Sequence, residues 1–164
     1  MVMLRSQASA TTHPPTSDPD LAVPRPRGRV RSILLATDLT TISEDATGQA
    51  IDMAASLGAR LLVVNVIDPR QQGHARRNRV DQARADREPM LLEVVNRARA
   101  RGVEATYLLW DGEPGRSIVA AAEAENVDLV VVGTRGLDRA GRFLLGSVSD
   151  HVVYHAACPV LVAR

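Results

Sequence analysis

The sequence contains no lysine, and all 20 of its basic residues are arginine. Arginine stays positively charged at every pH near neutrality and cannot supply the amine that some sites require. The absence therefore excludes a phosphate-binding loop that relies on a lysine, and it excludes covalent chemistry through a lysine Schiff base. Arginine, hydroxyl groups and main-chain amides can still bind an anion without lysine.

Aromatic residues are also scarce, at 2% of the chain. Proteins that hold single-stranded nucleic acid stack the bases on aromatic rings, so this composition disfavours nucleic acid as a partner. The formal net charge of +1 creates no strong field that would attract DNA, a membrane surface or an acidic substrate. The 164 residues, 45% of them hydrophobic, instead predict one globular domain with an aliphatic core.

The chain has one cysteine, Cys158, which cannot form an internal disulfide, and no apolar run has the length of a membrane span. Both features favour a cytoplasmic protein. Residues 1–28 are rich in Pro, Ser, Thr and Arg and lack the apolar segment of a secretory signal. We interpret them as a disordered tail that precedes a single domain at residues 29–164. A transit peptide is the alternative, which Asp18 and Asp20 disfavour.

Apolar runs rich in β-branched residues alternate with amphipathic stretches along the domain. Strands are predicted at residues 30–36, 61–67, 103–110, 127–132 and 159–163. Helices are predicted at residues 41–57, 80–101 and 114–125, and a fourth begins near Ser147. Strands joined by helices predict an α/β fold, in which a five-stranded parallel sheet with strand order 3-2-1-4-5 is covered by helices on both faces.

The ends of the predicted elements carry further signals. Thr41 and Glu44 have the spacing of a capping box, Ile42 falls on the apolar face of the first helix, and Gly58 suits the position after its last turn. In a sheet of this order, ligands bind where the strand order reverses, between the first and fourth strands. That rule places Asp38 and Gly133 at the rim of one crevice.

A glycine-rich segment, residues 133–147, follows the fourth strand directly. Gly133 and Gly136 can adopt backbone angles closed to other residues and leave room for a ligand, while Gly146 and Ser147 open a helix whose unpaired amides attract anions. Three or four hydrogen bonds to a charged group, at roughly 1.5 to 3 kcal/mol each, approach micromolar affinity without lysine. A phosphate chain fits this segment; a loop that only shapes a turn is the alternative.

The spacing of Gly133, Gly136, Gly146 and Ser147 resembles the ATP-binding signature of the universal stress protein family. The resemblance covers nearly all of the chain after the tail. Residues 33–38 (ILLATD), 64–68 (VNVID) and 155–162 (HAACPVLV) are similar to the family's first strand, the end of its second strand and its closing segment. This resemblance implies a Rossmann-like fold akin to the adenine nucleotide alpha hydrolases, usually dimeric, with ATP as ligand, alone or with magnesium.

The resemblance also implies which residues hold the nucleotide: Ala36, Thr37 and Asp38 at the nucleoside end, Val66 against adenine, and Gly133, Gly136, Gly146, Ser147 and Val148 around ribose and phosphates. Many ATP-binding relatives have proline where this chain has Ala36. Asp38 is itself negative, so we expect it to accept hydrogen bonds from adenine or ribose, or to help hold magnesium. Ser147 can donate to phosphate or cap its helix, and Arg135 is the arginine expected to pair with the outer phosphates.

Two other groups of residues invite a functional interpretation. His151 and His155 have the spacing of two zinc ligands, but no glutamate lies between them and no nearby Cys or Asp pair completes a tetrahedral site, so we expect structural roles. Arginines gather in the second connection and helix, interrupted by acidic residues: Arg70, Arg76, Arg77, Arg79, Arg84 and Arg87. A solvated helix with local ion pairs is favoured over a nucleic-acid patch.

Together these features predict an ATP-binding stress-response or regulatory protein of the cytoplasm, which forms a homodimer through its C-terminal strand and binds neither membrane nor nucleic acid. An enzyme is less favoured, because no water-activating base is evident in the sequence. Two alternatives stay open. One is a slow ATPase in which Asp38 or Asp138 assists a metal, and the other is a dimeric interaction module that needs no nucleotide.

Overall fold

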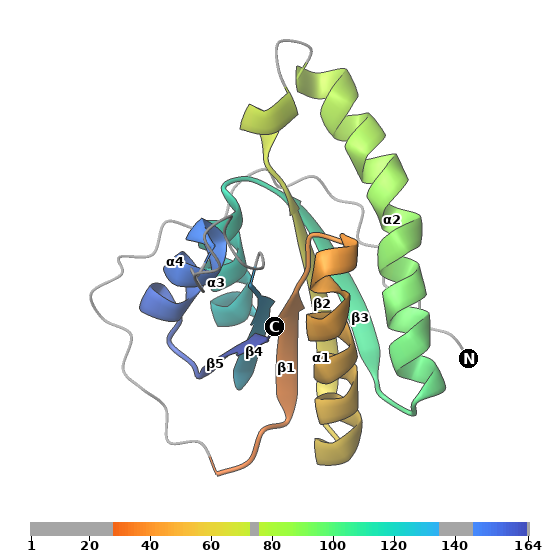
Figure 1. Cartoon of the computed structure of the whole chain (residues 1–164), viewed down its shortest axis with the longest axis vertical. Helices are drawn as coiled ribbons and strands as arrows, with labels where there is room; N and C mark the ends of the chain where they lie inside the picture. Colours follow the sequence, from red (N-terminus) through yellow and green to blue (C-terminus); the bar gives the residue numbers. More distant parts are fainter. Residues whose placement is uncertain (1–27, 73–75, 135–145, 164) are drawn as a thin grey trace.

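The computed structural model describes residues 28–72, 76–134 and 146–163, where strands and helices alternate along the chain (Figure 1). The strands are β1 (Ser32–Ala36), β2 (Arg60–Ile67), β3 (Ala105–Asp111), β4 (Leu129–Gly133) and β5 (Val160–Ala163). The α-helices are α1 (Glu44–Leu57), α2 (Arg76–Ala100), α3 (Pro114–Ala124) and α4 (Ser147–His155). Two short 3-10 helices are η2 (Thr41–Ser43) and η3 (Pro69–Gln72). The predicted tail at residues 1–28 lies outside the described residues, except for Gly28.

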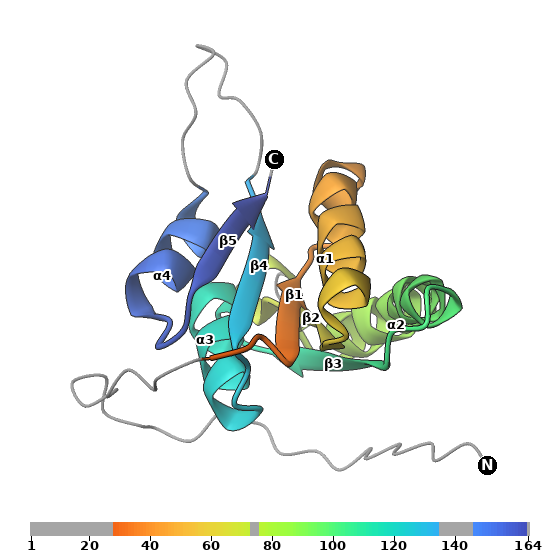
Figure 2. The same ribbon diagram turned by 90° about the horizontal axis from the view of Figure 1, so that it is seen from below.

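All five strands belong to one parallel sheet in the order β3-β2-β1-β4-β5, which confirms the predicted topology. Helices α1 and α2 pack on one face of the sheet, and α3 and α4 pack on the other (Figure 2). The central strand β1 pairs with β2 on one side and with β4 on the other. The strand order therefore reverses between β1 and β4, at the middle of the sheet.

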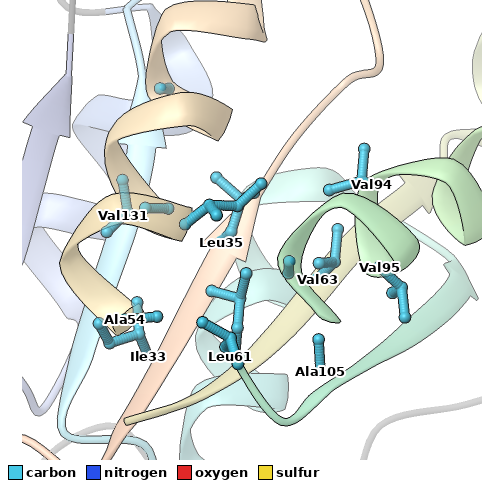
Figure 3. Close-up of a cluster of buried hydrophobic side chains, with 14 of the residues drawn as sticks. Ile33, Leu35, Ala54, Leu61, Val63, Val94, Val95, Ala105 and Val131 are labelled. Carbon is cyan, nitrogen blue, oxygen red and sulfur yellow. The ribbon is translucent and has the colours of Figure 1, made fainter. Parts of the chain in front are cut away.

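Each face of the sheet has its own aliphatic core, because successive side chains of a strand point to opposite faces. Ile33 and Leu35 of β1 are fully buried beneath α1 and α2, where they pack with Val95 (Figure 3). Leu34 points the other way and packs with Ile118 of α3. Because burying one such side chain contributes about 1.5 to 3 kcal/mol, these two clusters account for the apolar runs in the strands.

The amino ends of β1 and β4 are joined by one side chain. The Asp128 carboxylate accepts hydrogen bonds from the Arg31 amide at 2.9 Å and from the amide and hydroxyl of Ser32 at 3.0 Å each. In return, the Asp128 amide donates to the Ser32 carbonyl at 2.9 Å. The amino edge at the centre of the sheet is therefore closed by paired polar groups.

The start of α1 differs from the predicted capping box. Thr41 lies in the 3-10 turn η2, and the residue before α1, Ser43, makes no side-chain capping bond to the helix. The Ser43 hydroxyl instead donates to the Thr40 carbonyl at 2.8 Å, which tightens this turn. Ile42 is 61% exposed, so its predicted place on the buried face of α1 is wrong. The predicted role of Gly58 is confirmed, since it ends α1 in the left-handed region with φ 61°.

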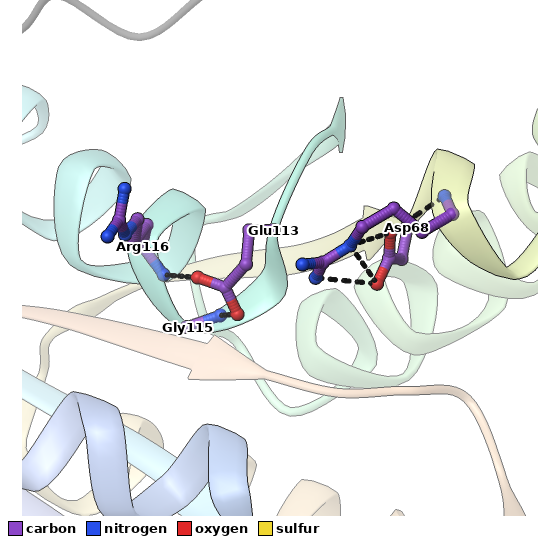
Figure 4. A network of polar contacts seen from close by, with 5 residues as sticks. Asp68, Glu113, Gly115 and Arg116 are labelled. Atoms are coloured by element: carbon purple, nitrogen blue, oxygen red, sulfur yellow. Dashed lines mark hydrogen bonds and ion pairs between the residues drawn. The ribbon is translucent and has the colours of Figure 1, made fainter.

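Helices α3 and α4 contact each other closely at the start of α3. Pro114 occupies the first turn, and the Glu113 carboxylate caps the helix by accepting from the amides of Gly115 and Arg116 at 3.1 and 2.8 Å (Figure 4). A Cβ atom on Gly115 would lie 2.9 Å from three atoms of His151 on α4. Glycine is needed here because α4 passes too close for any side chain.

Gly115→Ala is expected to lower the free energy of unfolding by about 1 to 3 kcal/mol, since the new methyl group forces α4 away from α3. The matched control is Gly48→Ala in α1, where an added Cβ meets nothing within 4 Å. That control should raise stability by roughly 0.5 to 1 kcal/mol through helix propensity. Urea denaturation of both variants measures the difference, and equal stability of the two would contradict the close contact.

The same contact predicts a pH dependence. Burial, followed by the nearby His155, lowers the pKa of His151 below its ordinary value. The unfolded chain then binds the proton more readily, so stability should fall as the pH drops below about 6.5 toward the folded pKa. The unfolding free energy measured between pH 7 and pH 5 should therefore decline less steeply in His151→Gln than in the unaltered protein. An identical slope in both proteins would argue against a neutral His151 in the fold.

Candidate functional site

The carboxyl ends of the central strands bring several predicted site residues to one edge of the sheet. Ala36, the last residue of β1, lies in register between Val64 of β2 and Val132 of β4. The Thr37 amide continues this pairing by donating to the Val64 carbonyl at 3.0 Å. Gly133 ends β4 directly after Val132. The segment from Ala36 to Asp38 and the start of the glycine-rich segment thus share one edge, as predicted.

The loop after β1 is fixed by its own side chains. The Thr37 hydroxyl, 7% exposed as a residue, accepts from the Leu39 amide at 3.0 Å and shares a hydrogen bond with the Ser43 hydroxyl at 3.0 Å. Leu39 adopts a left-handed backbone with φ 63°, which is unfavourable for a residue with a branched side chain. The loop therefore has a defined conformation that local hydrogen bonds maintain against backbone strain.

Asp38 lies at the exposed tip of this loop. Its Oδ1 atom accepts from the Thr40 amide at 3.1 Å and from the Thr40 hydroxyl at 2.7 Å. The carboxylate thus stabilises the loop and at the same time presents negative charge at the carboxyl edge. This arrangement agrees with a group that accepts hydrogen bonds rather than one that holds phosphate.

The start of α4 has a glycine at its N-cap. Gly146 occupies that position in an extended conformation, with φ −64° and ψ 153°, and no side-chain capping bond is formed among the residues that the structure describes. Ser147 is the first helical residue and is exposed, so the predicted alternative role of Ser147 as the N-cap is wrong. The first amides of a helix have no partner within it and carry partial positive charge. This helix end can therefore accept an anion.

Some of the other residues predicted to hold the nucleotide are described by the structure, and some are not. Ala36, Val66 and Val148 all belong to the apolar cluster on the face covered by α3 and α4. Gly133 has no left-handed backbone, and a Cβ on it would make an ordinary contact, 3.5 Å from Ala46. Gly133 therefore does not use the backbone angles that only glycine adopts readily. Arg135, Gly136 and Asp138 lie outside the described residues.

The structure adds two residues that the sequence interpretation missed. Asn65 of β2 is 2% exposed and points to the α1 and α2 face; its Nδ2 donates to the Thr37 carbonyl at 2.8 Å. Arg87 of α2 donates to Asn65 Oδ1 at 2.9 Å and to the Val66 carbonyl at 3.2 Å. The signal was present in the sequence, because Asn65 interrupts the apolar run LLVVNVI at an inward position.

The arginines of α2 are thus not all solvated. Arg84 lies one turn before Arg87 and donates to the Leu109 carbonyl at 3.1 Å and to the Asp111 carboxylate at 2.8 Å. Arg70, in η3, forms a two-pronged ion pair with the buried carboxylate of Asp68, with Nη2 to Oδ2 at 2.9 Å (Figure 4). Of the arginines in the predicted cluster, Arg70 forms a local ion pair, with Asp68, whereas Arg84 and Arg87 of α2 bond to groups of β3 and β2.

A small cavity of about 90 Å³ lies behind the β1 loop. Its walls come from that loop, from the start of α1 and from the middle of α2, and they include the hydroxyls of Thr40 and Thr47 together with Met90 and Val94. The cavity lies on the α1 and α2 side of the sheet, whereas Val66 and Val148 belong to the opposite face. The loop therefore separates this cavity from the apolar residues predicted to contact adenine.

The two histidines of α4 contact each other directly. The rings of His151 and His155 stack with centroids 4.0 Å apart, and His155 Nδ1 is 2.8 Å from the His151 carbonyl oxygen. Within the described ranges, no group of three or more His, Cys, Asp or Glu side chains is placed to hold a metal ion. No helix of these ranges is both long and apolar enough to cross a membrane.

Comparisons with known proteins agree with this geometry. The model of the universal stress protein family matches residues 29–164. The universal stress protein in QAH/OAS sulfhydrylase 3′ region of Thermus aquaticus is 39% identical over 144 residues, which cover 82% of this chain and 98% of that protein.

Solved structures of universal stress proteins are also similar to this chain. A universal stress protein in complex with cAMP has a TM-score of 0.67 and 27% identity, covering 84% of this chain and 98% of that one. The universal stress protein from Archaeoglobus fulgidus in complex with dAMP has a TM-score of 0.63 and 25% identity, covering 82% and 98%. The chain described here belongs to the universal stress protein family.

Proposed function

We propose that this chain binds an adenine nucleotide at the carboxyl edge between β1 and β4, with ATP as the ligand, and that occupancy regulates its interactions in a cytoplasmic stress response. The observation that carries the proposal is that the Ala36–Asp38 segment and the end of β4 share one edge of the sheet, while Val148 in the first turn of α4 packs against the same apolar cluster as Ala36. Two structural relatives in complex with cAMP and dAMP support an adenine nucleotide as the class of ligand.

The described residues suggest how the ligand would lie. The apolar side chains of Ala36, Val66 and Val148 offer a surface for adenine, and Asp38 supplies a hydrogen-bond acceptor for the nucleoside. Ser147 is exposed, and its amide and hydroxyl can donate to phosphate oxygens, because the N-cap residue Gly146 has no side chain to bond to the helix end. In this proposal, Gly136 and Arg135 complete the phosphate side, and magnesium arrives with the nucleotide.

A regulatory role is favoured over hydrolysis by the state of the Asp38 carboxylate. Its Oδ1 already accepts two hydrogen bonds from Thr40, so its geometry serves the loop. Phosphoryl transfer needs positioned metal clamps and an oriented nucleophile. We therefore propose a protein in which the nucleotide changes order or shape at the carboxyl edge rather than one that turns it over.

The homodimer through the C-terminal strand is also part of the proposal. Strand β5 lies at one end of the sheet and, among the strands that the structure describes, pairs only with β4. The amides of Val130 in β4 and of Thr134 just after it donate to the carbonyls of Pro159 and Ala163, so by alternation the polar main-chain groups of Val162 face the open edge. The strand VLVA carries no charge that would protect this edge from pairing with a second copy.

Ser147→Asp provides a direct test of nucleotide binding. A carboxylate in the first turn of α4 suits the helix dipole, so unfolding stability should stay equal or rise by about 0.3 to 1 kcal/mol. The same charge repels a triphosphate, so ATP affinity measured by calorimetry should fall more than about ten-fold, equivalent to 1.4 kcal/mol. The ATP affinity of Ser147→Ala, which removes only the hydroxyl, should lie between that of Ser147→Asp and that of the unaltered protein.

The opposite signs of the two effects make the result specific. Unchanged ATP affinity in a stable Ser147→Asp protein would place the phosphates elsewhere. Absence of ATP binding by the unaltered protein at millimolar concentration would refute the proposal as a whole.

Val162→Pro tests the proposed dimer. Proline removes a main-chain N–H that faces the open edge and leaves the β4 pairing intact, so it should block strand addition without unfolding the sheet. Light scattering coupled to size exclusion should then show a monomer, while Val162→Thr, which keeps the N–H, should remain a dimer. A dimer that persists in Val162→Pro would show that the contact lies elsewhere.

A further inference from the structure

A continuous chain of hydrogen bonds crosses from α2 to the loop after β1. It begins at Arg87, whose Nη1 donates to Asn65 Oδ1 at 2.9 Å and to the Val66 carbonyl at 3.2 Å. It continues through Asn65 Nδ2, which donates to the Thr37 carbonyl at 2.8 Å. It ends at the Thr37 hydroxyl, which contacts both Ser43 and Leu39. Four elements, α2, β2, the β1 loop and η2, are thereby connected.

Burial makes this chain of bonds costly to break. Asn65 and Thr37 are 2% and 7% exposed, and every fully buried side-chain N or O atom of the described residues has a hydrogen-bond partner. Removing one partner would leave a buried polar group without compensation, which costs more than an ordinary hydrogen bond contributes. Within this series of hydrogen bonds, the side-chain amide of Asn65 both accepts from Arg87 and donates to the loop, so it links the two.

We propose that Arg87 and Asn65 act as positioning residues for nucleotide binding, because together they fix the Thr37 carbonyl and the Val66 carbonyl at the two ends of the nucleoside subsite. This inference rests on the proposed function. Thr37 directly precedes Asp38, and Val66 is the predicted adenine contact. One guanidinium on α2 therefore sets the spacing between the β1 loop and the end of β2, although neither Arg87 nor Asn65 needs to touch the ligand.

The strain in the loop explains why such positioning matters. Leu39 adopts φ 63°, a conformation that an unconstrained leucine avoids. The loop keeps this conformation through the hydrogen bonds of Thr37 and Asp38. If the Thr37 carbonyl loses its donor, the loop gains alternatives in which Asp38 no longer lies where the nucleoside would meet it. Affinity then falls, because only a fraction of molecules is competent to bind.

Two substitutions break the chain of bonds at different points. Arg87→Met removes the donor from α2 and keeps an unbranched side chain. Asn65→Asp keeps an acceptor for Arg87 but loses the N–H that donates to Thr37. Each should raise the Kd for magnesium-ATP, measured by calorimetry, about ten-fold. Arg87→Lys, which restores one donor, should recover part of the affinity.

Arg84→Met is the matched control. Arg84 lies on the same helix and carries the same charge, but its hydrogen bonds go to a backbone carbonyl and a carboxylate of β3 rather than to Asn65. It should lower the melting temperature about as much as Arg87→Met does and change the Kd less than about two-fold. Equal loss of affinity in Arg84→Met and Arg87→Met would overturn the proposal, since it would show a general effect of helix packing or charge.

Hydrogen exchange separates this proposal from the proposed function. Without nucleotide, the peptide that covers residues 36–41 should exchange faster in Arg87→Met and in Asn65→Asp than in the unaltered protein, and at an unchanged rate in Arg84→Met. Unchanged exchange in both broken variants would overturn the positioning role, whatever the ligand result. Failure of the unaltered protein to bind ATP, with the exchange pattern as expected, would refute the nucleotide site while the ordering of the loop by Arg87 and Asn65 stands.

Discussion

The position of β1 at the centre of a parallel sheet is the constraint on which the site depends. Because β1 pairs in register with β2 and with β4, the segments that leave these three strands emerge side by side. The chain from β1 turns toward α1 on one face, and the chain from β4 leads to α4 on the other. In sheets of this kind, ligands bind at the edge where the chain leaves neighbouring strands toward opposite faces.

Within this frame, the absence of lysine has a clear physical consequence. The groups that the described site offers to an anion are the exposed hydroxyl of Ser147 and the amides of the first turn of α4, all of which are fixed by the backbone. The arginines of α2 that reach the edge are already occupied with carbonyls and carboxylates of β2 and β3. Positive side chains thus shape the site, and the main chain supplies much of its attraction for a phosphate group.

The sequence predicted the fold well because the signals for it are periodic and repeated. Runs such as ILLA and LLVVNVI indicate buried strands, and Gly58 and Gly102 end their helices with φ 61° and 77° as glycine permits. The proximity of Ala36–Asp38 to Gly133 followed from topology alone. Each of these features needs only local pattern or a rule about sheets.

The errors came from side-chain hydrogen bonds that no periodic pattern shows. Thr41 and Glu44 fit a capping box, yet Ser43 bonds to its near neighbours Thr40 and Thr37 instead, and the helix starts later. The link from Arg87 to Asn65 spans 22 positions, so no local pattern could show that an arginine in a charged helix serves the sheet edge. A buried asparagine in an aliphatic strand was the one visible hint, because such a residue always requires partners.

The bonds of Asp128 at the opposite edge have a consequence for how such a molecule can change over time. They tie β1 to β4 at the amino end with polar groups that take no part in the candidate site. Mutations can therefore remodel the loops at the carboxyl end, and with them the choice of ligand, while the two central strands remain anchored to each other at their origin. The bonds that hold β1 to β4 and the loops that would recognise a ligand thus lie at opposite ends of the same sheet.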